Sequence, residues 1–219
     1  MWNLKLRRWR MLSFMLAAGL LCHPPDAATA ADVSFRNDVM AVLSKAGCNQ
    51  GVCHGNKHGK GGFQLSLRGF EPQTDYEVLT RSISSRRINR LDPEQSLILL
   101  KATMQIAHQG GRRFHEDSPE YWILPDWFAG GTQWDNEQVP VLEQLDVTPA
   151  KAVLTDPVDE VQIHVEALFS DGSRRDVTDM AVYEPSSMIV EVGSAGRVSR
   201  QSFGETTVVV RYLNQQTPV

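Results

Sequence analysis

The sequence is poor in cysteine and has no apolar run near its start that is long enough to cross a membrane. Only three of the 219 residues are cysteine, and one of these lies within the first 30. The apolar stretch 11–21 has eleven residues, whereas a helix needs about 20 to cross a bilayer core of about 30 Å. We therefore expect a mature chain that does not span a membrane.

An excess of basic residues is also absent. Lys and Arg total 22 against 26 Asp and Glu, giving a formal charge of −4. Nucleic-acid-binding domains concentrate positive charge to neutralise phosphates, so we expect no nucleic-acid partner. No Ser-His-Asp set, paired-carboxylate pocket or phosphate-binding glycine loop stands out, so we predict that this chain is not an enzyme. A catalytic domain beyond residue 219 is compatible with that prediction.

The first 30 residues have the layout of a secretory signal peptide. Four basic residues precede the apolar stretch, and Ala-Thr-Ala at 28–30 supplies the small residues that signal peptidase requires. We expect cleavage after Ala30 rather than lipidation of Cys22, which follows a bulky residue. Cleavage leaves a formal charge near −7. It also places the chain in the periplasm or at the cell surface, where paired thiols do not stay free unless something binds them.

Residues 33–136 are predicted to form a mostly helical domain. Helices are expected to begin at residue 34, at Pro72, after Asp92-Pro93 and at Ser118-Pro119. One face of the first helix carries the apolar residues Phe35, Val39, Val42 and Ala46. Pro125 is expected to kink or split the last helix.

Residues 150–219 are predicted to form an antiparallel β-sandwich, with 137–149 as the linker. Apolar and polar residues alternate along VQIHVEALF, residues 161–169, and the hairpin-turn signal Asp171-Gly172 follows. Further alternating runs occur in SMIVEV and TTVVVRYL, separated by glycine-containing turns. Strands this short and regularly interrupted are typical of a sandwich.

The segment AGCNQGVCHGNKHG, residues 46–59, holds both remaining cysteines, Cys48 and Cys53, with His54 directly after them. A disulfide between the cysteines would close a short loop and stabilise the chain only modestly, because the entropy removed grows with loop length. A zinc site with His58 as fourth ligand would require the adjacent Cys53 and His54 to bend back onto one ion.

A covalent haem explains more features of this segment than a disulfide or a zinc site does. In c-type attachment two cysteines bond the vinyl groups of the porphyrin and the next histidine binds iron, usually as C-x-x-C-H. Here four residues separate Cys48 from Cys53, so two extra residues must bulge outward, which the conformational freedom of Gly51 would allow. The adjacency of Cys53 and His54 is kept. We favour one covalent haem c; the alternative is a secreted structural or adhesion protein whose cluster is a disulfide or zinc staple.

Several stretches also resemble a known family. CNQGVCHGNKHGKGGFQLSLRGFEPQTDYEVL, SLILLKATMQIAHQGGRRF and SPEYWILPDWFAGG resemble the N-terminal cytochrome c domain of large exported planctomycete-type proteins. FSDGSRRDVTDMAVYEPSS and GRVSRQSFGETTVVVRYL are similar to a group-2 bacterial immunoglobulin-like domain. The resemblance implies a mostly α cytochrome c-like domain at 33–136 and an all-β immunoglobulin-like domain at 150–219. It also implies that the second domain is cut short here and belongs to a longer multidomain chain.

Iron in a c-type site takes a proximal histidine and usually a distal His or Met. His54 is the proximal candidate; we favour His108 as the distal ligand, with Met104 or an open position as the alternatives. Arg112 and Arg113 are candidates for charge-assisted bonds to the haem propionates. The sequence thus predicts an extracytoplasmic module that carries single electrons to a redox partner protein. Its acidic surface would favour a basic partner, and the immunoglobulin-like domain would act as a spacer or adhesion module.

Overall fold

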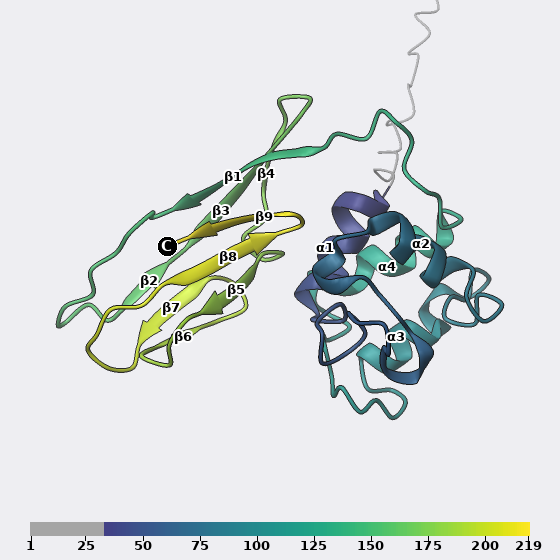
Figure 1. Ribbon diagram of the computed structural model, residues 1–219, viewed down its shortest axis with the longest axis horizontal. Helices are drawn as coiled ribbons and strands as arrows, with labels where there is room; N and C mark the ends of the chain where they lie inside the picture. Colours follow the sequence, from purple (N-terminus) through teal and green to yellow (C-terminus); the bar gives the residue numbers. More distant parts are fainter. Residues whose placement is uncertain (1–32) are drawn as a thin grey trace, which may run out of the picture. The chain divides into compact units, whose positions relative to one another are not determined.

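The computed structural model describes residues 33–219 (Figure 1). The predicted signal peptide, 1–30, lies outside the described residues. The helical elements are η1 (Phe35–Val39), α1 (Met40–Lys45), η2 (Lys60–Gly62), η3 (Leu67–Gly69), α2 (Pro72–Thr80), η4 (Pro93–Gln95), α3 (Leu97–Ala102) and α4 (Pro119–Ala129). The strands are β1 (Leu142–Thr148), β2 (Glu160–Gln162), β3 (His164–Phe169), β4 (Arg174–Asp176), β5 (Val182–Pro185), β6 (Val190–Val192), β7 (Arg197–Arg200), β8 (Val208–Tyr212) and β9 (Gln215–Pro218).

The first helical stretch begins where the sequence predicts. The Ser34 hydroxyl accepts a hydrogen bond from the Asn37 backbone N–H at 3.0 Å, and the Ser34 N–H donates to the Asp38 carboxylate at 2.9 Å. The π-helical turn η1 then continues directly into α1. The predicted apolar face is buried, each member being at most 3% exposed: Phe35, Val39, Val42 and Ala46. These side chains pack in one apolar cluster with residues of α2, α3 and α4.

The prediction of a mostly α, cytochrome c-like first domain is wrong. Helices account for only 25% of the described residues and strands for 21%. The reason is the density of helix-breaking residues: the segment 55–62 contains four glycines. The expected third helix is likewise divided into η4 and α3 at Ser96, whose backbone is extended. By contrast, α4 runs as one helix through Pro125.

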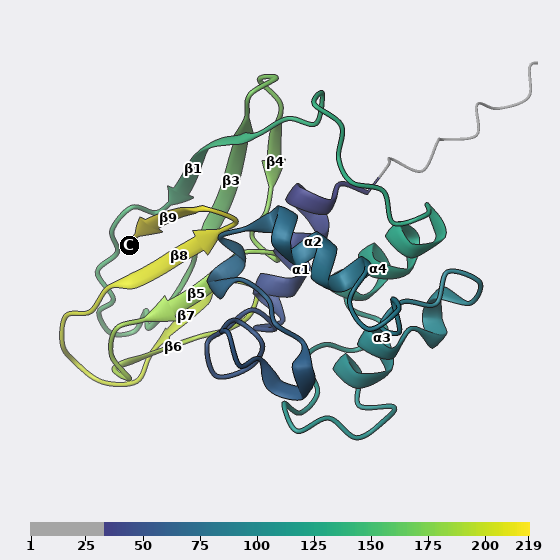
Figure 2. The ribbon, with the colours of Figure 1, turned by 45° about the vertical axis from the view of Figure 1, so that its right-hand side comes forward.

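The β part consists of three antiparallel sheets of three strands each, β1-β3-β4, β2-β7-β6 and β5-β8-β9. Figures 1 and 2 both show β1, β3 and β4 side by side. The predicted alternation along 161–169 is confirmed, with buried Ile163, Val165, Ala167 and Phe169 and exposed His164 and Glu166. The run divides between two sheets, because β2 pairs with β7 and β3 with β1 and β4. This β content is consistent with an immunoglobulin-like sandwich.

Strand residues contact the helix that leads to the cysteines. Ala41 of α1 belongs to the buried apolar cluster that is otherwise formed by residues of the β part. The Tyr212 hydroxyl of β8 donates to the Asn37 carbonyl at 3.1 Å, and Arg175 of β4 pairs with Asp38 at 2.6 Å. Helix α1 is therefore held by two apolar clusters, which fixes the start of the loop that follows it.

Candidate functional site

The cysteine–histidine segment folds as a tight loop directly after α1. The Cys48 backbone N–H donates to the Leu43 carbonyl at 2.9 Å, and the His54 N–H donates to the Cys48 carbonyl at 3.0 Å. The second bond closes the loop. Of the four residues between the cysteines, Gly51 and Val52 bulge outward, with Val52 73% exposed, whereas Asn49 is fully buried. The wide cysteine spacing thus leaves Cys48 and His54 close together in space.

Two glycines allow the chain to turn this tightly, and neither is Gly51. A Cβ at Gly55 would lie 1.9 Å from the Asn49 carbonyl oxygen, and one at Gly59 would lie 2.0 Å from the Phe63 carbonyl oxygen. A Cβ at Gly51 would meet its nearest atom at 3.6 Å, which is an ordinary contact. Gly55 and Gly59 are required because another backbone segment passes where their side chains would begin.

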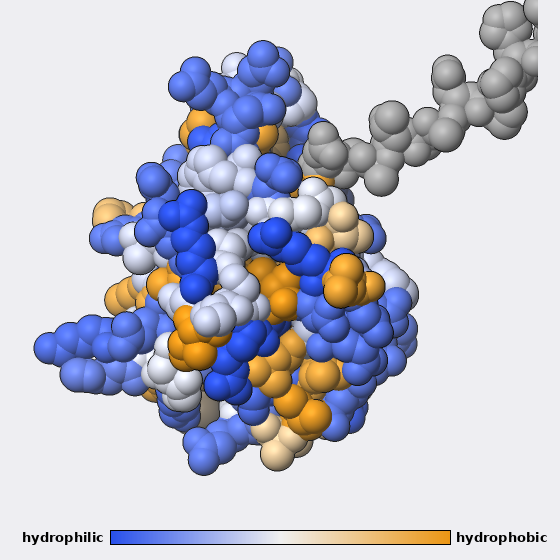
Figure 3. Space-filling view, turned by 90° about the vertical axis from the view of Figure 1, so that its right-hand side faces the viewer, coloured by the Kyte–Doolittle hydropathy of each residue, from blue (hydrophilic) through white to orange (hydrophobic). Residues whose placement is uncertain are grey.

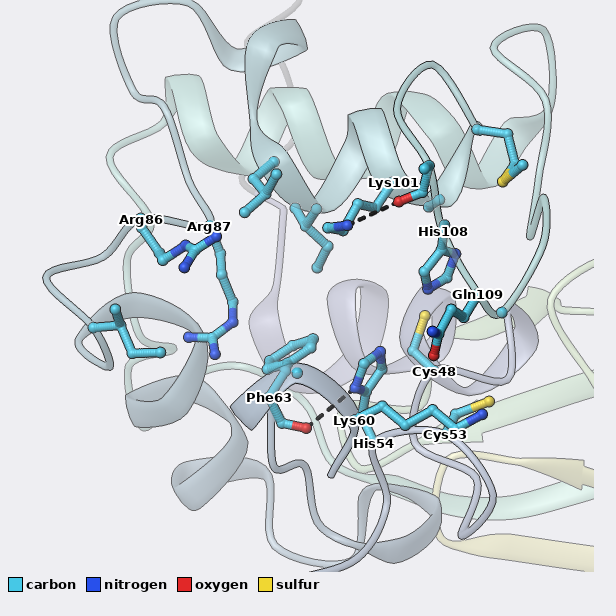
Figure 4. A pocket seen from close by; sticks show the side chains of 18 residues that line it. Cys48, Cys53, His54, Lys60, Phe63, Arg86, Arg87, Lys101, His108 and Gln109 are labelled. Carbon is cyan, nitrogen blue, oxygen red and sulfur yellow. Dashed lines mark hydrogen bonds between the residues drawn. The ribbon is translucent and has the colours of Figure 1, made fainter. Parts of the chain in front are cut away.

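A cavity of about 730 Å³ opens beside this loop (Figure 4). Its wall includes five of the residues predicted to hold the haem: Cys48, Cys53, His54, Met104 and His108. Three chain segments contribute to the wall: the segment from the loop after α1 through η2 to Phe63, the loop between α2 and η4, and α3 with the loop that follows it. The wall combines apolar and basic side chains, and Figure 3 shows apolar patches bordered by strongly hydrophilic residues on the helical part. The volume and largely apolar wall are typical of sites for organic ligands or cofactors.

The two histidines of the cavity lie parallel to one another. The ring centres of His54 and His108 are 6.4 Å apart, and the ring planes differ by 7°. Each Nδ1 lies near a backbone carbonyl: that of His54 is 3.2 Å from the Phe63 oxygen, and that of His108 is 2.8 Å from the Gly111 oxygen. Because a carbonyl can only accept, each Nδ1 carries the proton and donates it. Each Nε2 is then left with a lone pair, which is the form of imidazole that binds metals.

Burial supports this protonation state for His54. Removal from water lowers the pKa of His54, an effect larger than the opposing contribution of its bond to the Phe63 carbonyl. Electrostatic interactions with His108 and Arg87 lower this pKa further. The imidazole of His54 is therefore neutral at pH 7. The ring also packs against Phe63, with 4.8 Å between ring centres.

Both cysteines of the cavity wall are free thiols. Burial is the main cause that raises the pKa of the Cys48 thiol to about 11, so this group is protonated at neutral pH. Among residues 33–219, no three His, Cys, Asp or Glu side chains are grouped so that they could hold an ion by themselves. In Figure 4 both sulfur atoms lie on the same side of the cavity as His108.

The remaining predicted residues are placed differently. Met104 lines the cavity but is 41% exposed. Arg112 and Arg113 are not among the lining side chains. The Arg113 guanidinium donates to the Ala46 carbonyl at 2.6 Å and to the Gly110 carbonyl at 3.0 Å. It therefore joins the end of α1 to the loop that carries His108.

Sequence reasoning missed several residues of the wall. Phe63 forms part of it, and the Arg87 guanidinium carbon lies 4.5 Å from the centre of the Phe63 ring. The Lys101 ammonium donates to the Ala107 carbonyl at 3.0 Å, directly before His108. None of these belongs to a motif. The adjacent pair Arg86-Arg87 was the only local signal, and such pairs are usually solvated.

No model of a known protein family matches this chain, and no curated protein sequence matches it. The side chains of the cavity comprise two thiols, two oriented imidazoles, an aromatic ring and several cations.

Proposed function

We propose that residues 33–136 bind one covalent haem c in this cavity and carry single electrons. The observation that carries the proposal is the arrangement of His54 and His108. An imidazole nitrogen lies about 2 Å from a bound metal and about 1.1 Å from its own ring centre, so two imidazoles on opposite sides of one iron have ring centres about 6 Å apart. The 6.4 Å between the two ring centres agrees with this value.

The thiols fit the same ligand. Cys48 and Cys53 line the cavity that holds the imidazoles, and Cys53 immediately precedes His54. Their Sγ atoms would hold the haem through thioether bonds to its two vinyl groups. When bound, the iron would accept and release one electron. The protein contributes no bond-making step of its own, so we do not propose an enzyme.

Groups around the cavity would orient the iron ligands. The carbonyls of Phe63 and Gly111 fix the two imidazole rings through Nδ1, which leaves each Nε2 lone pair available. Arg113 and Lys101 hold the loop that carries His108. Ligands fixed in this way favour electron transfer, because little has to rearrange when the charge on the iron changes.

The proposal also covers where the chain is located and what it interacts with. We propose that the chain is exported, since a covalent bond retains haem where a dissociated one would be lost. A redox partner protein would exchange the electrons, and the β-sandwich would act as a spacer or adhesion domain. Among the described residues, no helix has the length and apolar character needed to cross a membrane.

Haem attachment can be tested directly. The chain is produced together with a c-type haem maturation system, run on a denaturing gel and stained for peroxidase activity. We expect a stained band and a mass increase equal to one haem, both abolished in the double variant Cys48→Ala, Cys53→Ala. The variant His58→Ala is the matched control, because His58 is exposed and does not line the cavity. Unmodified mass in the presence of working maturation machinery would reject the proposal.

A further inference from the structure

Arg87 is a buried cation whose charge is not balanced by an acid. Only 6% of the Arg87 surface is exposed. Among the described residues, no Asp or Glu forms an ion pair with it. Burial, followed by the neighbouring charge of Arg86, lowers the pKa of Arg87. An arginine nevertheless stays charged in proteins, so the positive charge remains in the wall of the cavity.

The hydrogen bonds of Arg87 fix the side chain but do not neutralise it. Its guanidinium donates to three backbone carbonyls, those of Val78 at 3.3 Å, Ser82 at 3.4 Å and Gly62 at 3.1 Å. A guanidinium has five N–H groups. Two of those on Arg87 therefore have no acceptor within the described part of the chain. The stacking on Phe63 further restricts the group.

A buried charge of this kind needs a counter-charge. Moving an ion out of water costs several kcal/mol unless an opposite charge or a full set of hydrogen bonds compensates it. The side chains that line the cavity include the cations Lys60, Arg86, Arg87 and Lys101 and no carboxylate. The cavity wall thus carries an excess of positive charge, which favours an occupant that carries negative charge.

The two ends of the cavity also carry different chemical groups. Figure 4 shows Arg86 and Arg87 on the side away from Cys48 and Cys53, with Phe63 and His54 between them. A ligand that fills this space would meet thiols at one edge, with the Lys60 ammonium beside them, imidazole nitrogens near its centre and two guanidinium groups at the opposite edge. Protoporphyrin carries its two vinyl groups and its two propionates on opposite edges of the ring, in the same order.

We infer that Arg87, assisted by Arg86, binds the carboxylates of the ligand at the end of the cavity opposite the cysteines. This inference rests on the proposed haem function and names residues other than the predicted Arg112 and Arg113. Arg87 is a positioning residue: its fixed guanidinium sets the orientation of the macrocycle before the thiols react. Its charge also raises the reduction potential, because a nearby cation favours the less positive iron.

The test compares two porphyrins that differ only in their carboxylates. The chain carrying Cys48→Ala and Cys53→Ala is titrated with ferric protoporphyrin and with its dimethyl ester, and binding is followed by the Soret absorbance. Hydrogen bonds to charged groups contribute about 1.5–3 kcal/mol, so we expect the diacid to bind roughly tenfold or more tightly than the ester. Adding Arg87→Gln should remove this preference, and Arg87→Lys should restore part of it.

Arg90→Gln is the matched control. It removes the same charge three residues away, at an exposed side chain outside the cavity wall. This variant should keep the full preference for the diacid. A preference that survives Arg87→Gln would overturn the inference and leave the haem proposal standing. If the thiol-free chain binds neither porphyrin, the electrochemical comparison below decides the inference; absence of haem attachment in the staining experiment would overturn the proposed function, and the inference with it.

A second measurement covers the case in which Arg87→Gln does not fold without a bound ligand. The covalently loaded protein is titrated electrochemically in three forms: unchanged, Arg87→Lys and Arg87→Gln. We expect the reduction potential to fall in Arg87→Gln and to stay near the original value in Arg87→Lys. If Arg87→Gln cannot be purified even with haem attached, Arg86→Gln replaces it. This variant should lower the reduction potential by a smaller amount, because Arg86 is exposed. Potentials unaffected by these substitutions would contradict the assignment.

Discussion

Replacing Gly55 with alanine tests the loop that brings Cys48 and His54 together. On the present backbone, the new Cβ would lie 1.9 Å from the carbonyl oxygen of Asn49 and 2.5 Å from its carbon. Carbon and oxygen atoms in contact are usually separated by about 3.3 Å. The two backbone segments would therefore have to move apart by more than about 1 Å to accept one methyl group.

This movement breaks hydrogen bonds whose contribution to the free energy of unfolding can be estimated. The Gly55 N–H donates to the Gln50 carbonyl at 2.9 Å, and the neighbouring His54 N–H donates to the Cys48 carbonyl at 3.0 Å. Each hydrogen bond contributes about 1 kcal/mol. With the added backbone strain, we expect Gly55→Ala to lower the free energy of unfolding by about 3 kcal/mol or more, which is large for a single substitution. Displacement of the loop should also reduce haem attachment sharply.

Urea unfolding of the haem-free chain measures the first effect, and haem staining measures the second. Gly51→Ala is the matched control, since its Cβ would meet nothing closer than 3.6 Å. We expect this variant to unfold within about 0.5 kcal/mol of the original chain, as surface substitutions usually do. Equal unfolding midpoints for the two alanine variants would refute the reasoning.

Three further predictions concern the ligands and their supports. In the loaded protein, His108→Ala should abolish the six-coordinate low-spin absorption spectrum, whereas Met104→Ala should keep it; the reverse outcome would assign the distal position to methionine. Arg113→Met removes hydrogen bonds at 2.6 and 3.0 Å and should lower the free energy of unfolding by about 2 kcal/mol, measured in urea. Burial raises the pKa of Tyr212 to about 12, from 10.0 in an ordinary tyrosine. Stability should then be full below pH 10 and fall as the pH rises towards 12; in Tyr212→Phe, thermal unfolding should show a smaller alkaline loss.

Local sequence patterns predicted where the helices and strands begin, but they did not predict how much of the chain is helical. Ser34 and Pro72 mark real helix starts because capping and proline geometry act within one turn of the chain. The strand alternation at 161–169 is likewise local. The length of each helix depends on where tertiary contacts stop supporting it. Ser96 interrupts the expected third helix because its hydroxyl accepts the Asn89 N–H and its backbone is extended there.

In the candidate site, too, some residues could be found from local sequence and others could not. Cys48, Cys53 and His54 could be selected from sequence because they lie in one short segment, and His108 could be selected from its position in the loop after the third predicted helix; all four line the cavity. The cationic end could not, because Arg87 reaches the cavity from a loop with no motif or periodicity. The arginines at 112 and 113 were nearer to His108 along the chain, but Arg113 instead donates to two backbone carbonyls. Proximity in sequence is a poor guide wherever a loop reverses direction.

Each group in the cavity has an ordinary explanation when considered alone. Buried thiols are common, a histidine bonded to a carbonyl is usually structural, and an arginine can be fixed by carbonyls without binding anything. These explanations do not account for the two free imidazole nitrogens and the unbalanced charge of Arg87 in the wall of one cavity. A protein that needed only a core would fill this space with apolar side chains, since empty volume and buried charge both reduce stability. The combination therefore favours an occupant that supplies a metal, vinyl-type electrophiles and carboxylates together, and haem supplies all three.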